Sequence, residues 1–130
     1  MKTQQCKSIA PNEVPFFTIY TLVHFAVGYL SMRWLSPYFN QTLLFIILLT
    51  AHTVFEIWES TPSGVAFFNN RLWNGTRDFF RTNFGWDLWC QYPGDSLVNS
   101  IGDTIAFILG MIFYIKFKGP SARPYLKFRL

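Results

Sequence analysis

The sequence predicts an all-α fold: a polytopic integral membrane protein with about three transmembrane helices and one interfacial amphipathic helix. Of its 130 residues, 51% are hydrophobic and only 14% are charged, whereas an average soluble domain is about 25% charged. The shortage of charge is concentrated in long uncharged runs, and the first of them, residues 14–32, is close to the roughly 20 residues that cross a bilayer. The length fits one domain, residues 1–130.

The first span is predicted near residues 14–34. Its fixed charge is Arg33, which together with Trp34 is typical of a membrane interface. Asn12 can cap the helix, and Pro15 fits a first turn, where a missing N–H costs little. One face of this span carries a stripe of polar and small residues: Tyr20, His24, Gly28 and Ser31.

The second span is predicted near residues 42–59. Asn40 and Gln41 can begin the helix, and the Ser-Thr-Pro-Ser-Gly run at 60–64 ends it. Three ionisable side chains fall within an arc of about 60° on one face of this helix. They are His52, Glu56 and Glu59.

Residues 65–84 predict an amphipathic helix. Its apolar face is formed by Val65, Phe68, Leu72, Phe79 and Phe80. Its polar face is formed by Asn70, Arg71, Asn74, Arg77, Asp78 and Arg81. Arginine on the polar side is typical of a helix that lies in the interface plane. Gly75 weakens the helix near its middle, so two short helices are an alternative.

The third span is predicted near residues 96–116, followed by a basic tail at 117–130. Asp95 either caps this helix or belongs to its polar face. That face carries Asp95, Asn99 and Asp103 and continues as a groove of small residues, Gly102, Ala106 and Gly110. Small residues let a second helix approach closely. We therefore expect this groove to hold another helix, from this chain, a protein partner or a second copy.

The net charge of +4 lies largely in the C-terminal tail. We therefore interpret this positive charge as a determinant of membrane topology and as a contact with membrane lipids, and we expect no nucleic-acid partner. With three spans, six of the eleven Lys and Arg residues lie on the side of the C-terminus and five on the opposite side, which favours a cytoplasmic C-terminus. The sequence leaves the identity of the membrane open. The two cysteines, Cys6 and Cys90, have no metal-binding spacing, and we expect two unpaired thiols.

Ionisable side chains within spans usually face the bundle interior and pair there. We therefore predict that the polar stripes of the three spans meet near one membrane face. The candidate site residues are His52, Glu56, Glu59, Asp95, Asn99 and Asp103.

Four interpretations of this cluster stay open. Buried polar pairs can hold the helices in register, as in a structural or assembly component. The same groups can serve as general acids and bases of an intramembrane enzyme, acting on a lipid or lipid-linked substrate. They can hold a divalent metal, with His52, Glu56 and Asp103 as ligands. They can also relay protons or ions. The sequence leaves the cofactor unknown, with none as one possibility, and leaves open whether the protein is an enzyme.

Two stretches resemble a family of small bacterial membrane proteins without an established activity, distantly akin to VanZ-like proteins. The family patterns are H-x-x-F-E-x-x-E and G-D-S-x-x-N-S-x-x-D, and Ser60 departs from the Asn expected after the first. The matching positions are His52, Phe55, Glu56, Glu59, Gly94, Asp95, Ser96, Asn99, Ser100 and Asp103. The resemblance implies a multi-span helical protein with a shared acid/His set and supplies no function.

Overall fold

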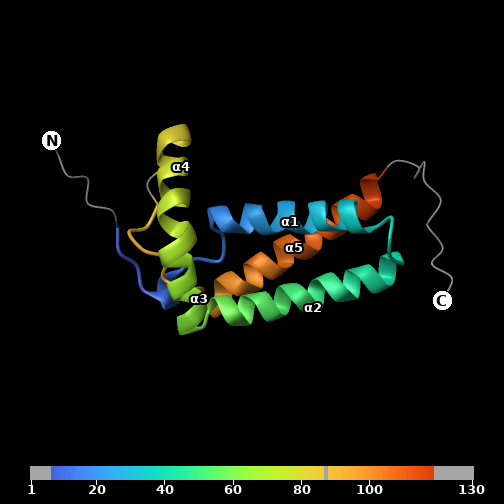
Figure 1. Cartoon of the computed structure of the whole chain (residues 1–130), viewed down its shortest axis with the longest axis horizontal. Coiled ribbons are helices and arrows are strands. Elements are labelled where there is room, and N and C mark those ends of the chain that lie inside the picture. The colour runs from blue at the N-terminus through green and yellow to red at the C-terminus, as the bar shows by residue number, and fades with distance from the viewer. Residues whose placement is uncertain (1–6, 87, 119–130) are drawn as a thin grey trace.

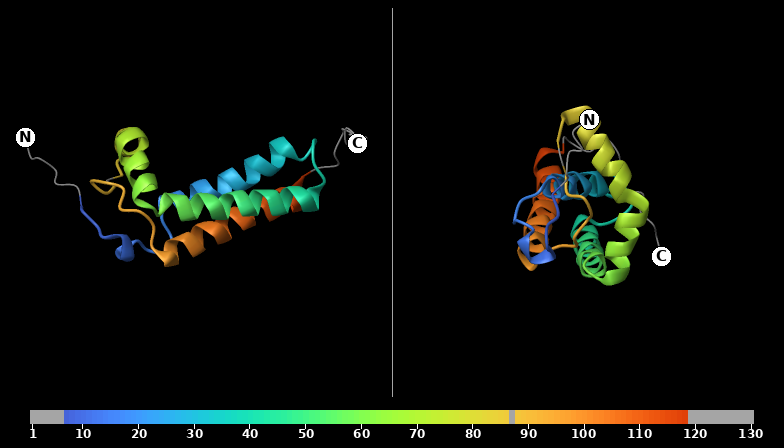
Figure 2. Two further views of the ribbon diagram at one scale, coloured as in Figure 1. Left: turned by 60° about the horizontal axis from the view of Figure 1, so that its bottom comes forward. Right: turned by 90° about the vertical axis from the view of Figure 1, so that its left-hand side faces the viewer.

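The computed structural model describes residues 7–86 and 88–118, and these residues form helices joined by loops, without strands. Three long helices lie side by side: α1 (Ile19–Leu35), α2 (Gln41–Glu59) and α5 (Leu97–Phe117) (Figure 1). Helices α1 and α5 run in the same direction and α2 runs in the opposite one. Viewed end-on, the three form a triangular bundle (Figure 2). The helical fold class predicted from the sequence is confirmed.

Side-chain caps set the first turns of the three helices. Asn40 accepts hydrogen bonds from the backbone N–H groups of Thr42 and Leu43, which confirms the predicted start of α2. Helix α1 begins at Ile19, five residues later than predicted, because Thr18 is its cap. Asn12 lies in a short 3-10 turn, Pro11–Glu13, and does not cap α1.

The cap of α5 is Ser96, whose hydroxyl accepts from the N–H of Asn99 and donates to the carbonyl of Val14 at 2.7 Å. The cap position suggested for Asp95 is therefore wrong. A cap oxygen that also bonds the segment before α1 ties the starts of α1 and α5 together, and Asp95 is left to face α2.

Helices α1 and α5 touch backbone to backbone through glycines. A Cβ atom added to Gly28 would lie 2.2 Å from the carbonyl oxygen of Phe107, and one added to Gly110 would lie 2.0 Å from that of Phe25. A Cβ atom added to Gly102 would lie 2.2 Å from the carbonyl oxygen of Phe16. The small-residue face of Gly102, Ala106 and Gly110 is thus filled by α1 and the segment before it.

Helix α2 packs less closely on this pair. Four of its 19 residues are buried: Leu44, His52, Glu56 and Glu59. Leu44 joins a small apolar core with Met32, Phe107 and Met111. Three of the four buried residues of α2 are ionisable, so α2 meets the bundle through its polar stripe as well as through the apolar Leu44, Phe45, Leu48 and Leu49.

The predicted amphipathic segment is one continuous helical arm that crosses the end of the bundle where α1 and α5 begin (Figure 1). It comprises α3 (Pro62–Phe67), a π-helical turn η2 (Phe68–Trp73) and α4 (Asn74–Phe84). The alternative of two helices separated at Gly75 is wrong, since Gly75 lies within α4. Contacts with the loop at 89–92 hold the arm: Asn69 bonds both backbone groups of Tyr92, and Trp73 donates to the carbonyl of Trp89.

The loop that follows the arm also joins the N-terminal segment. The backbone N–H of Cys90 donates to the carbonyl of Lys7 at 3.1 Å. Cys90 is disulfide-bonded, which overturns the expectation of a free thiol at this position. Cys6 lies outside the described residues.

Two helices, α2 and α5, are long and apolar enough to cross a membrane. Large apolar side chains on the outward faces of all three long helices are exposed. On α1 these include Leu22, Val23, Val27 and Leu30, on α2 Leu43, Ile46, Ile47, Val54 and Ile57, and on α5 Val98, Ile101, Ile105, Leu109 and Phe113.

Candidate functional site

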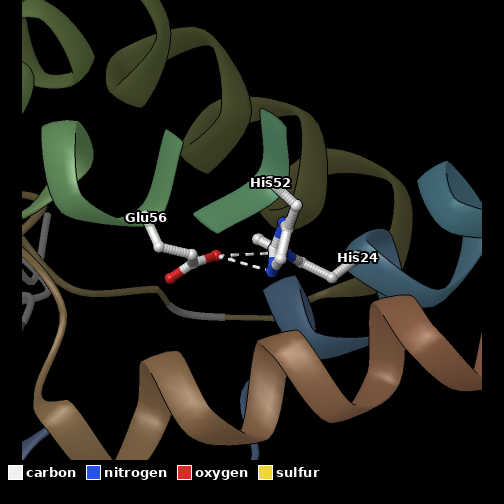
Figure 3. A group of neighbouring side chains, drawn as sticks. All are labelled: His24, His52 and Glu56. Atoms are coloured by element: carbon white, nitrogen blue, oxygen red, sulfur yellow. Dashed lines mark ion pairs between the residues drawn. The ribbon is translucent and has the colours of Figure 1, made fainter. Parts of the chain in front are cut away.

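Three side chains from two helices meet in the bundle interior (Figure 3). His24 comes from α1, and His52 and Glu56 come from successive turns of α2. The Oε1 atom of Glu56 lies 3.3 Å from Nδ1 of His24 and 3.5 Å from Nε2 of His52. One carboxylate oxygen therefore faces two imidazole nitrogens.

This carboxylate is buried and lacks hydrogen bonds. The Glu56 side chain is 6% exposed, and the two imidazoles are 12% and 4% exposed. Among the described residues, neither oxygen of Glu56 has a hydrogen-bond partner of normal geometry, although the Ser100 hydroxyl lies near enough to interact with this carboxyl. A buried polar group without hydrogen bonds costs stability. Such a group is therefore kept at a cost, which is common for groups that serve a function.

Both imidazoles are fixed by a second set of contacts. The His52 ring stacks on Phe107 at a centroid distance of 4.3 Å, and its Nε2 lies 3.2 Å from the hydroxyl of Thr104. The Nε2 atom of His24 lies 3.8 Å from Oδ2 of Asp103. The other nitrogen of His24 is thereby directed toward Glu56, so the orientation of this ring is defined from both sides.

Asp103 joins α5 to α1, and Asn99 joins α5 to the segment before α1. Asp103 accepts a hydrogen bond from the hydroxyl of Thr21 at 2.5 Å, and both side chains are buried. The amide of Asn99 donates to the backbone carbonyl of Pro15 at 3.0 Å. Because these groups have partners, they act as internal polar contacts of α5.

A second acidic group lies toward the arm. One carboxylate oxygen from each of Glu56, Glu59 and Asp95 lies within 4.8 Å of the others. Tyr92 donates a short hydrogen bond to Oε1 of Glu59, whereas Oε2 of Glu59 has no partner among the described residues. In the loop, burial and the negative charge of Asp103 raise the pKa of the Asp95 carboxyl to about 6. Burial and the charge of Glu59 likewise raise the pKa of the Tyr92 hydroxyl.

Two grooves flank α2 and reach the cluster from opposite sides. The groove between α1 and α2 has a volume of about 400 Å³ and is lined by His24, His52 and Glu59 together with apolar side chains such as Val27, Leu48 and Phe55. The groove between α2 and α5 has a volume of about 600 Å³ and is lined by Glu56, Asp95, Ser100 and Thr104 among others. Apolar walls with a few convergent polar groups are typical of small-molecule sites.

The structure divides the six candidate residues into two sets. His52, Glu56, Glu59 and Asp95 lie beside the grooves, and Asn99 and Asp103 join α5 to α1 or to the segment before it. His24 was absent from the candidate set, although it lies at the centre of the cluster. The polar stripe of the first span was the signal that could have added it. His24 lies between Glu56 and Asp103, and it is His24 that lies next to His52 and Glu56, where Asp103 was predicted to lie.

Comparison with protein-family models, curated proteins and solved structures finds no match for this chain. The resemblance to VanZ-like proteins therefore stays a prediction, and the functional argument depends on the geometry of the site.

Proposed function

We propose that the chain is a polytopic membrane protein in which α1, α2 and α5 cross the bilayer. The apolar outward faces of all three helices support this proposal, since soluble monomers rarely expose apolar patches larger than a few hundred Å². Helix α1, with 17 residues, is about 26 Å long at 1.5 Å per residue. It therefore crosses with help from the residues before Ile19 or with local thinning of the bilayer.

The arm lies in the membrane interface at the end of the bundle where α1 and α5 begin. Its direction across the bundle axis and its exposed Leu72 and Phe79 support this position. The disulfide at Cys90 favours an oxidising compartment on the arm side. The end of α5 then faces the reducing side, in agreement with the distribution of basic residues in the sequence.

Within this bundle, the cluster of His24, His52 and Glu56 is a functional site for a lipid or lipid-linked molecule. The observation that carries this proposal is the buried carboxylate of Glu56, which finds no hydrogen-bond partner of normal geometry within residues 7–86 and 88–118 and faces two imidazoles between two apolar-walled grooves. The acyl chains of a lipid fit the apolar walls, and its polar headgroup supplies the hydrogen bonds that the cluster lacks. Imidazoles and carboxylates can then transfer protons to and from the bound headgroup.

A structural or assembly role is the second candidate. It is favoured by the bonded pair of Thr21 and Asp103, which joins α1 to α5, and by the bond from Asn99 to Pro15, which joins α5 to the segment before α1. This role accounts for Asn99 and Asp103 and gives no reason for a buried carboxylate that faces two imidazoles and has no hydrogen-bond partner in the described part of the chain.

Lipid analysis of the purified protein tests the site. We expect lipid to remain bound at a stoichiometric ratio after detergent extraction and to be lost from Glu56→Gln. Asp78→Asn is the matched control, because Asp78 is an exposed carboxylate on the arm and its change should leave lipid binding unaltered. Equal lipid content in the parent chain and in Glu56→Gln, with both folded, would support the structural role instead.

A further inference from the structure

We infer that His24, His52 and Glu56 bind a divalent transition-metal cation, and that Zn²⁺ fits the site best. The inference deepens the proposed function, since it names a cation held at that same site. It differs from the ligand set His52, Glu56 and Asp103 that the sequence suggested, because it replaces Asp103 with His24.

The distances between the three side chains suit tetrahedral zinc. Zinc bonds nitrogen at about 2.0–2.1 Å and carboxylate oxygen at about 2.0–2.2 Å, so two ligand atoms at the tetrahedral angle lie about 3.3–3.5 Å apart. Oε1 of Glu56 lies 3.3 Å from His24 Nδ1 and 3.5 Å from His52 Nε2. One ligand atom from each residue lies within 4.8 Å of the others. Small side-chain adjustments are therefore enough to place one cation among the three.

The bonding state of Glu56 also favours a cation. Both of its oxygens are buried without hydrogen-bond partners in the described part of the chain. A divalent cation would supply the missing positive charge, and the imidazoles would then bind the metal as neutral ligands. The hydroxyl of Thr104, now 3.2 Å from His52 Nε2, would give up that contact when the metal binds.

The surroundings of the ligands resemble those of known zinc sites. Metal-bound histidine commonly directs its second nitrogen at a carboxylate, which fixes the ring. Asp103 stands in that relation to His24 at 3.8 Å and is itself held by Thr21. Two histidines and one glutamate form a ligand set used by catalytic zinc, which keeps a fourth position for water or substrate. His24 and His52 both line the groove between α1 and α2, so that position can be reached from it.

The ligand types distinguish this site from the acidic group beside it. Imidazole nitrogen suits zinc and other late transition metals, whereas Ca²⁺ and Mg²⁺ prefer oxygen. Glu59 and Asp95 offer oxygen alone, and Glu59 already accepts a hydrogen bond from Tyr92. Glu59 lies in the same groove, and its Oε2 atom has no hydrogen-bond partner in the part of the chain that the structure describes, so it stays available as a proton acceptor next to the cation.

The test is zinc binding by the full-length, tag-free protein in detergent or nanodiscs, measured by competition with a chromophoric chelator and by elemental analysis. We expect one Zn²⁺ per chain. His24→Asn, His52→Asn and Glu56→Gln should each lower the affinity by more than about 100-fold. Asp103→Asn should lower it by about 10–100-fold, the usual effect of a residue that orients a ligand. Asp78→Asn should leave it unchanged.

Three results would overturn the inference. The first is the absence of stoichiometric zinc binding by the parent chain. The second is a loss of affinity in Glu59→Gln as large as that in Glu56→Gln, which would assign the cation to the acidic group. The third comes from X-ray absorption of the zinc-loaded parent chain, which does not depend on the folding of any variant. There we expect two imidazoles in the coordination shell, and a shell of oxygen alone would contradict the site.

The metal inference and the proposed function can fail separately. Stoichiometric lipid in a zinc-free protein that does not bind added zinc would reject the metal and keep the lipid site. Stoichiometric zinc at these ligands, without retained lipid, would keep the metal and reject the proposed substrate class.

Discussion

Replacing Gly110 with leucine is expected to prevent α1 from packing on α5 and to leave the chain misfolded. Even the first atom of a side chain at this position has no room. A Cβ atom would lie 2.0 Å from the carbonyl oxygen of Phe25, 2.9 Å from its carbonyl carbon and 3.0 Å from the backbone nitrogen of Tyr29. All three neighbours are backbone atoms, so no side-chain rotation relieves the overlap.

The expected cost exceeds the about 1–3 kcal/mol typical of an overpacked core, because the helices themselves must separate. Gly110→Ala should already destabilise the protein strongly. The measurement is thermal or denaturant unfolding in detergent, together with size-exclusion chromatography of the folded fraction.

Gly75→Ala is the matched control for this prediction. A Cβ atom at Gly75 meets nothing within 4 Å, and alanine favours a helix over glycine by about 0.5–1 kcal/mol. This variant should therefore be as stable as the parent chain or slightly more stable. If Gly110→Ala were equally stable, the close contact between α1 and α5 would be wrong.

Glu56→Gln is expected to keep or raise the stability of the fold while it abolishes binding at the site. The change removes a buried carboxylate that has no hydrogen bonds and replaces it with a neutral amide of similar shape. The amide is itself polar and meets the same neighbours, so the change relieves only the cost of burying a negative charge, and the stability should stay unchanged or rise modestly. Functional groups often reduce stability in this way.

Asp103→Ala should behave in the opposite way. It removes the acceptor of the buried Thr21 hydroxyl, so it should lower the stability by about 1–3 kcal/mol. Comparing the unfolding free energies of the two variants in the same detergent, without added metal, separates the roles of the residues. If Glu56→Gln lost as much stability as Asp103→Ala, Glu56 would also serve as an internal polar contact that holds the helices together.

The helices were predictable because each has a clear local signal. The side chain of Asn40 is a strong cap, and the predicted start and end of α2 match the structure to one residue. The start of α1 was not predictable from local signals, because Asn12 and Thr18 are both good caps. The choice between them depends on contacts of the preceding segment with α5, such as the bond from Ser96 to Val14.

The content of the site was predictable only in part. Helical periodicity assigned His52, Glu56 and Glu59 to one face, and all three are buried on α2. It could not give the rotation or height of α1 relative to α2, which depend on the glycine contacts between α1 and α5. Those contacts bring His24 to Glu56 and leave Asp103 on the far side of His24.

Membrane topology is the most direct test of the central claim that α1, α2 and α5 all cross the bilayer. Four exposed positions can each be replaced singly by cysteine: Asn12, Tyr38, Asn70 and Lys116. Each variant is labelled with a membrane-impermeant maleimide in sealed, uniformly oriented membrane vesicles under non-reducing conditions, with the parent chain as background. We expect the Asn12 and Asn70 variants to react on one side of the membrane and the Tyr38 and Lys116 variants on the other, so that one pair reacts only after permeabilisation. Labelling of all four from one side would contradict a three-span bundle.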